Sequence, residues 1–171
     1  MIYCRSVSVG GEAEWEFAWR MFEQATTAAE VQNLRYSLAC SMDHSLLTRY
    51  LMFAMMPWKI KRQDALGTII LVAQNINGKR PAWNFVKENW ASIVSEFQMA
   101  ELIAGLVDGI TSRFSTKVDL QELKEFKETV KTGGYHTAIR IVNKAIERTT
   151  AYIQWREDNE GEIYQWVRKN L

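Results

Sequence analysis

The sequence has few residues that could form a flexible linker. Only two prolines and nine glycines occur among its 171 residues, and 47% of all residues are hydrophobic. A chain of this length and composition can bury one well-packed core. The sequence therefore predicts a single domain over residues 1–171, with little room for a disordered segment.

The chain also has no excess of charge of either sign. Its 21 lysines and arginines nearly balance 20 aspartates and glutamates, which leaves a formal net charge of +1. The basic residues form no stripe in the sequence, whereas proteins that bind nucleic acid usually carry one. We therefore expect no nucleic-acid partner.

No apolar run is long enough for a membrane helix. The longest run, residues 65–73, is interrupted by Gly67 and Thr68, and a membrane span needs about 20 apolar residues. Residues 1–5 contain no basic segment ahead of an apolar one, as a signal peptide would. We expect neither a membrane span nor a signal peptide within this chain.

The residue patterns of common catalytic sites are missing. A zinc peptidase binds its metal through His-Glu-x-x-His, in which two imidazoles lie one helical turn apart and the glutamate activates water. Here the two histidines, His44 and His136, stand far apart in the sequence. Gly-x-Ser-x-Gly is absent, and no phosphate-loop lysine follows Gly10-Gly11. We therefore expect no catalytic residue, no metal ligand and no cofactor in this chain.

Apolar residues recur at helical spacing through most of the chain. Trp15, Ala18, Trp19 and Phe22 lie at i, i+3, i+4 and i+7, which is one face of a helix. Similar patterns predict eight more helices, over residues 31–38, 46–54, 66–73, 81–97, 102–110, 123–130, 138–153 and 163–167. No strand-like alternation is convincing, so the predicted fold class is all-α with about nine helices.

Two residues are predicted to begin helices. Thr27 stands three residues before Glu30, which is the spacing of a capping box. Asp119 stands three residues before Glu122 and is predicted as the N-cap of the seventh helix.

Other residues are predicted to separate helices. Pro57 should end the third helix, because proline has no amide hydrogen to continue it. Asn77-Gly78 predicts a turn, and Pro81 suits the first position of the fifth helix. The resulting helix pairs, about 35–45 residues long, have the size of a HEAT or armadillo unit. We expect an irregular stack of antiparallel helix pairs, a HEAT/armadillo-like superhelix whose concave face binds extended partners.

Several segments resemble a known family. Tyr3-Cys4, residues 10–19 and residues 38–41 look like the opening of the C-terminal helical domain of animal M1 zinc aminopeptidases, closest to the aminopeptidase N branch. Residues 60–65 (IKRQDA), 83–90 (WNFVKENW) and 113–116 (RFST) fit later segments of that domain in the same order. The resemblance extends over residues 2–171.

The chain departs from that family in one connection. The family often has a glycine-rich turn where this chain has residues 95–100 (SEFQMA). We therefore expect a shorter connection there.

The resemblance implies that the chain is a non-catalytic part of a larger enzyme. That enzyme would be a zinc exopeptidase that removes N-terminal residues from peptides, and the zinc would lie in a catalytic domain absent from this chain. The helical domain would enclose the active-site cavity, help bind the distal part of the peptide, gate the opening and form a homodimer. Its location would be the extracellular side of the cell surface or the secretory pathway.

The resemblance also singles out individual residues. Arg113, and with less weight Arg49 and Arg62, are candidates for contact with the peptide or the catalytic domain. The spacing of Cys4 and Cys40 by itself allows either two buried thiols or a disulfide; the family carries a structural disulfide in this sequence context, which favours the bond.

A second hypothesis stays open at the level of sequence. The chain could be a free-standing helical-repeat adaptor that binds peptides or proteins in its concave groove. That hypothesis predicts reduced cysteines and a stable monomer.

Overall fold

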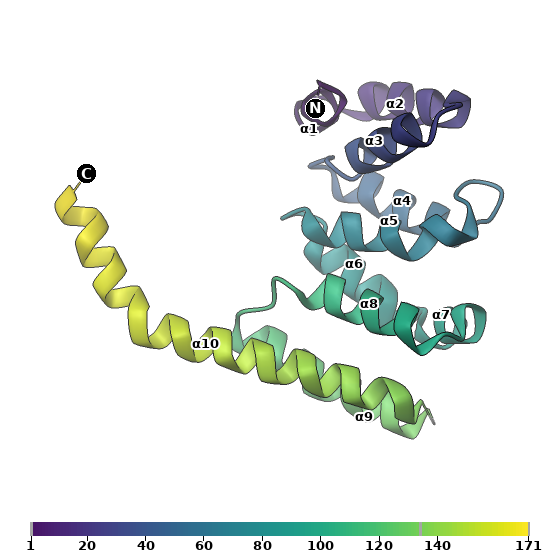
Figure 1. The fold of residues 1–171 in the computed structure, drawn as a ribbon. Coiled ribbons are helices and arrows are strands. Elements are labelled where there is room, and N and C mark those ends of the chain that lie inside the picture. Colours follow the sequence, from purple (N-terminus) through teal and green to yellow (C-terminus); the bar gives the residue numbers. More distant parts are fainter. Residues whose placement is uncertain (1, 134, 171) are drawn as a thin grey trace. The chain divides into compact units, whose positions relative to one another are not determined.

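The computed structural model describes residues 2–133 and 135–170, and this part of the chain is almost entirely helical (Figure 1). The all-α prediction is confirmed, with ten helices and no strand among these residues. The helices are α1 (Ile2–Val9), α2 (Glu12–Gln24), α3 (Ala28–Leu38), α4 (His44–Ala54), α5 (Arg62–Gln74), α6 (Lys79–Glu88), α7 (Trp90–Phe97), α8 (Ala100–Thr111), α9 (Lys117–Thr132) and α10 (His136–Asn170).

The chain divides into two compact units, Met1–Ile110 and Thr111–Leu171, here called unit 1 and unit 2. In unit 1 each helix packs on helices close to it in sequence: α2 on α3, α4 on α5, and α5 on α6. Successive helices joined by short turns form the antiparallel pairs that the sequence predicts, and Figure 1 shows them side by side. In the part of the chain that the structure describes, no helix is both long and apolar enough to cross a membrane.

Aromatic side chains form the centre of the first helix pairs in unit 1. Trp15 is fully buried and stacks on Trp19 with ring centroids 5.7 Å apart, while Tyr50 of α4 meets Trp15 edge-on at 5.9 Å. The indole Nε1 of Trp15 donates to the carbonyl of Leu38 at 3.1 Å. Large aromatic rings with satisfied polar atoms contribute strongly to burial, so this cluster holds α2, α3 and α4 together.

A buried arginine joins α3, α4 and α5. Arg35 pairs with the carboxylate of Asp64 and donates to Gln32 Oε1 at 2.7 Å. The hydroxyl of Tyr50 donates to the Arg35 carbonyl at 3.0 Å. Burial raises the pKa of Tyr50 far above its usual range, because ionisation would place a charge in the protein interior.

The N-terminal helix is held by a disulfide between Cys4 and Cys40. The bond that the resemblance implies is therefore present in the structure. Asn75 Nδ2 fixes the same turn by donating to the carbonyls of Ala39 and Ser41. Because the two cysteines are 36 positions apart in sequence, a chain-entropy model gives a stabilisation of about 3–4 kcal/mol.

Three helix boundaries in unit 1 differ from prediction. Helix α1 was not predicted, since only Val7 of its residues is buried and no apolar stripe marks it. The predicted fifth helix is two helices, α6 and α7, which meet at Asn89; its side-chain amide donates to the Phe85 carbonyl at 2.8 Å and ends α6. Pro81 is the third residue of α6 rather than the first. It still lies in the first turn, where amides have no intrahelical acceptor.

Two other predicted boundaries are confirmed. Thr27 is the N-cap of α3, and its hydroxyl accepts from the Glu30 amide. Asn77-Gly78 forms the turn before α6. A side chain at Gly78 would meet the carbonyl of Val72, so this turn requires glycine.

Unit 2 contains a pair of helices, α9 and α10, which lie side by side in Figure 1. The prediction of Asp119 as N-cap is wrong, because Thr116 takes that position. The Thr116 hydroxyl accepts from the Asp119 amide, and the Asp119 carboxylate accepts from the Ser115 and Thr116 amides, all at 3.1 Å. The predicted eighth and ninth helices are one continuous helix, α10, of 35 residues.

Candidate functional site

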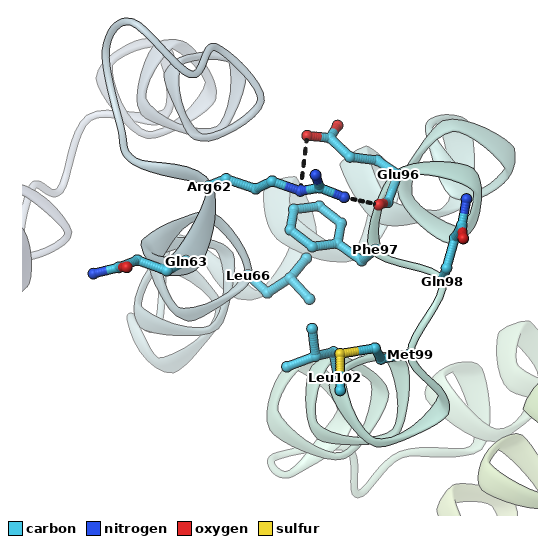
Figure 2. A pocket seen from close by; sticks show the side chains of 8 residues that line it. All are labelled: Arg62, Gln63, Leu66, Glu96, Phe97, Gln98, Met99 and Leu102. Atoms are coloured by element: carbon cyan, nitrogen blue, oxygen red, sulfur yellow. Dashed lines mark hydrogen bonds and ion pairs between the residues drawn. The ribbon is translucent and has the colours of Figure 1, made fainter.

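A pocket in unit 1 is the best candidate for a binding site. It lies between the start of α5 and the connection from α7 to α8, and its cavity volume is about 840 Å³. Ligand pockets in proteins usually measure about 300–1,000 Å³. Its lining residues are Arg62, Gln63, Leu66, Glu96, Phe97, Gln98, Met99 and Leu102 (Figure 2).

One side of the pocket is charged. Arg62 is the first residue of α5, and its guanidinium donates to the backbone carbonyl of Glu96. The same guanidinium lies 3.8 Å from the Glu96 carboxylate and 5.7 Å from the centre of the Phe97 ring. Figure 2 shows Arg62 reaching across to both residues. The Arg62 side chain is still 63% exposed, so a ligand can reach this cation.

The other side of the pocket is apolar. Leu66 and Phe97 are nearly buried, whereas Met99 and Leu102 are 59% and 43% exposed. The chain turns here at Gln98, whose φ is 35°. This backbone angle is uncommon for any residue other than glycine. Residues 96–99 thus form one wall of the pocket, and α7 and α8 are joined there by a connection of only two residues, Gln98 and Met99.

The lining of the pocket combines charged, polar and apolar side chains. Its eight lining residues include one arginine, one carboxylate, two amides and four apolar side chains. A cation beside an apolar wall can hold a carboxylate together with an adjacent apolar group.

Arg49, the second candidate, has a different environment. Its guanidinium bonds to the carboxylates of Glu12 at 3.0 Å and Glu16 at 2.8 Å. It also lies 4.6 Å from the centre of the Trp15 ring. These contacts join α4 to α2 inside unit 1. Arg49 does not line the pocket that contains Arg62.

Arg113, the third candidate, belongs to unit 2. It lies in the connection from α8 to α9 and is exposed, while the following residue, Phe114, is buried at 1% exposure. Arg113 therefore belongs to a different unit from Arg49 and Arg62. Within unit 1, Arg62 lines the pocket described above and Arg49 does not.

The described residues offer no site for a metal. No group of three or more histidine, cysteine, aspartate or glutamate side chains could hold an ion in the part of the chain that the structure describes. His44 is exposed at the start of α4, and the side chain of His136 lies outside the described residues. Both cysteines are in the disulfide. The residues described here do not fit a zinc ion.

Of the residues that line this pocket, the sequence analysis named only Arg62 as a candidate contact, and that role stays a prediction. Glu96, Phe97, Gln98 and Met99 lie more than 30 positions away in sequence. The sequence analysis singled them out only as part of residues 95–100, where a short connection was expected. No local pattern predicts that this connection meets the start of α5.

The sequence profile of a family described as "ERAP1-like C-terminal domain" matches residues 1–151. The chain belongs to this family.

The chain is also similar to curated proteins over nearly its whole length. It is 37% identical over 170 residues to aminopeptidase N of Rattus norvegicus and 38% identical over 170 residues to aminopeptidase N of Mus musculus. It is 31% identical over 172 residues to the thyrotropin-releasing hormone-degrading ectoenzyme of Mus musculus. These matches cover 99%, 99% and 100% of this chain, but only 18%, 18% and 16% of the relatives. The chain thus spans less than a fifth of the length of these relatives.

Proposed function

We propose that this chain is the C-terminal helical domain of a zinc-dependent aminopeptidase that removes N-terminal residues from peptides. One observation carries the proposal: the family match over residues 1–151 together with 37% identity to an aminopeptidase N over 170 residues. In this proposal residues 1–171 act as one domain. Zinc, when bound, would activate water in a catalytic domain elsewhere in the same polypeptide.

The domain's role would be to enclose the active-site cavity and bind the distal part of the peptide. The pocket around Arg62 supports this role, because it presents an exposed cation beside exposed apolar side chains. The guanidinium would hold a peptide carboxylate while Leu66, Phe97 and Leu102 accept an apolar side chain. Binding energy gained far from the cleaved bond helps to position the reacting end of the substrate.

Other residues would act in support of this binding. Arg49 holds α4 against α2 through Glu12 and Glu16 and so keeps unit 1 in shape. Arg113 would contact the catalytic domain. The domain would also gate the opening of the cavity and provide a homodimer surface. We place the protein on the extracellular side of the cell surface or in the secretory pathway, where the Cys4–Cys40 disulfide would persist.

The first test is the native reading frame upstream of Met1. A continuous frame that encodes His-Glu-x-x-His and a further glutamate ligand would support the proposal. A native start at Met1 without such a frame would contradict it. The free-standing adaptor hypothesis would then lead.

The second test uses the complete polypeptide with Arg62→Ala. We expect about a ten-fold rise in KM for peptides of several residues, since a lost charge-assisted contact is worth about 1.5 kcal/mol. The hydrolysis of a single-residue chromogenic amide should be unchanged, because such a substrate does not reach the pocket. Arg20→Ala, at an exposed position of α2, is the matched control. Equal effects on both substrates would contradict peptide binding at Arg62.

A further inference from the structure

The pocket around Arg62, here called the Arg62 pocket, presents one charge of each sign. Two of its eight lining residues are charged, Arg62 and Glu96. The Arg62 side chain is 63% exposed and that of Glu96 is 33% exposed, so a ligand in the pocket can reach both groups. The two charges sum to zero, and a ligand that complements them both is itself neutral overall.

The pairing between these two residues leaves most of their bonding capacity for a ligand. Arg62 Nε lies 3.8 Å from a carboxylate oxygen of Glu96, which is beyond hydrogen-bond distance. The hydrogen bond between them runs from the guanidinium to the backbone carbonyl of Glu96. A guanidinium has five N–H donors and a carboxylate has about four acceptor positions. This pair therefore uses one of the five donors and none of the carboxylate's acceptor positions.

A ligand with only a negative charge does not complement both residues. In the proposed function Arg62 holds a peptide carboxylate, and Glu96 has no role. A carboxylate bonded to Arg62 would lie close to the carboxylate of Glu96, and like charges repel, more so where the surroundings are partly shielded from water. A ligand that also brings an ammonium group offsets this repulsion and gives Glu96 a charge-assisted hydrogen bond.

A free α-amino acid carries this pair of groups. Its ammonium and its carboxylate are attached to the same carbon atom, so they lie side by side, as the guanidinium and the carboxylate do in the pocket. A residue at the C-terminus of a peptide has a neutral amide in place of the ammonium. A residue at the N-terminus has no free carboxylate. The two charges on one carbon therefore distinguish a free amino acid from a peptide.

The apolar wall of the pocket supplies a place for the amino acid's side chain. Leu66 and Phe97 are nearly buried, while Met99 and Leu102 are 59% and 43% exposed. Figure 2 shows these four side chains next to the charged pair. Pockets for small ligands commonly combine an apolar lining with a few polar groups that fix the orientation. An apolar side chain suits this wall.

We propose that the Arg62 pocket binds a free apolar α-amino acid as a zwitterion. Its carboxylate bonds to Arg62, its ammonium bonds to Glu96 and its side chain packs on the apolar wall. Free amino acids are what an aminopeptidase releases, so the ligand belongs to the product class of the proposed reaction and competes with peptide for Arg62. That link to the product rests on the proposed function, whereas the binding itself does not.

Three related ligands test the binding in the 171-residue chain. L-leucine carries both charges, N-acetyl-L-leucine lacks the ammonium, and L-leucinamide lacks the carboxylate. In a titration followed by ¹H–¹⁵N nuclear magnetic resonance, L-leucine should shift amides of residues 62–66 and 96–102. It should bind at least about ten-fold more tightly than either derivative, since each derivative loses a charge-assisted contact.

Two results of this titration would overturn the proposal. Equal affinity for N-acetyl-L-leucine and L-leucine would mean that Glu96 does not bind an ammonium, and would leave Arg62 free to hold a peptide carboxylate. The absence of a saturable shift at residues 62–66 and 96–102 with L-leucine would mean that the pocket does not take an amino acid.

The variant Glu96→Gln separates recognition of the ammonium from a structural role. It should weaken L-leucine about ten-fold and should not weaken N-acetyl-L-leucine, which has no ammonium to lose. Glu88→Gln, at an exposed position of α6 that does not line this pocket, is the matched control and should change neither affinity. Equal weakening of both ligands by Glu96→Gln would assign Glu96 a structural role only and overturn the proposal.

Glycine tests the apolar wall, because it has the same two charges and no side chain. It should bind at least about ten-fold more weakly than L-leucine, since burial of apolar surface favours binding. Equal affinity would overturn the assignment of the wall. The titration and the upstream reading frame are read independently: a missing frame contradicts the proposed function, whereas a failure to distinguish the ligands contradicts the amino-acid site.

Discussion

The two units use similar helical patterns but cover them differently. In unit 1, Trp15 lies in a helix of apolar i, i+3, i+4 residues and is completely buried. In unit 2, Trp155 also lies among apolar residues at helical spacing, yet it is 57% exposed. The difference is what packs on each ring, because Trp15 stacks on Trp19 and meets Tyr50 of α4, whereas Trp155 faces solvent. Helical periodicity therefore predicts an apolar face but not whether that face is covered.

Replacing one tryptophan by alanine in each unit should give the largest difference between the units. Trp15→Ala should lower the free energy of unfolding by about 3–5 kcal/mol, because it leaves a large cavity and removes the donor to the Leu38 carbonyl. Trp155→Ala in the 171-residue chain should change it by no more than about 0.5 kcal/mol. Urea unfolding followed by far-ultraviolet circular dichroism measures both. Comparable losses in the two variants would show that Trp155 is covered in the isolated chain.

Ion pairs give a second, smaller contrast. Asp64→Asn leaves the Arg35 side chain, 9% exposed, without its carboxylate. We expect a loss of about 2–3 kcal/mol, somewhat below the cost for a fully buried pair because Asp64 is itself a quarter exposed. Glu160→Gln removes the ion pair between Glu160, which is 67% exposed, and Arg156, which is 45% exposed. This change should lower the free energy of unfolding by less than about 0.5 kcal/mol. Thermal unfolding measures both changes. An unchanged free energy of unfolding in Asp64→Asn would show that the Arg35–Asp64 pair does not stabilise unit 1.

The smallest contrast concerns pH. The pKa of Tyr50 is raised by burial in the folded state, whereas a tyrosine in the unfolded chain ionises near pH 10. The unfolded state therefore loses this proton first. The stability associated with Tyr50 is complete below about pH 10 and falls as the pH rises further, by up to about 1.4 kcal/mol per pH unit.

Tyr50→Phe should remove that part of the alkaline slope. Tyr164→Phe, at an exposed position of unit 2, controls for the loss of a hydroxyl. Urea unfolding at pH values from about 9 to 11 measures the slope. An unchanged slope in Tyr50→Phe would mean that water reaches this hydroxyl in the folded protein.

Local sequence patterns predicted most of the fold. Apolar spacing located the main helices, and Thr27 was correctly predicted as an N-cap from its own side chain and Glu30. The prediction of Asp119 as an N-cap was wrong although the same kind of signal, Thr116 followed by Asp119, was present. Helix α1 was missed because a short helix with one buried residue has no periodic pattern to detect.

The candidate site was predictable only in part. Arg62 could be singled out because it lies in the segment Ile60 to Ala65, which resembles the family. Its partners, Glu96 and Phe97, could not, because they approach it only after α5, α6 and α7 have packed. Arg49 was also predicted as a contact residue, which stays a prediction; its ion pairs with Glu12 and Glu16 of α2 could not be predicted from a local pattern.

The sequence by itself determined the helical fold class and the family of this chain. Both depend on residues a few positions apart, whose spacing fixes the apolar face of each helix. The tertiary structure alone decided that Arg62 meets Glu96 and that Trp15 is buried whereas Trp155 is exposed. Burial depends on which distant segments pack together, and that packing is a property of the whole chain rather than of any local pattern.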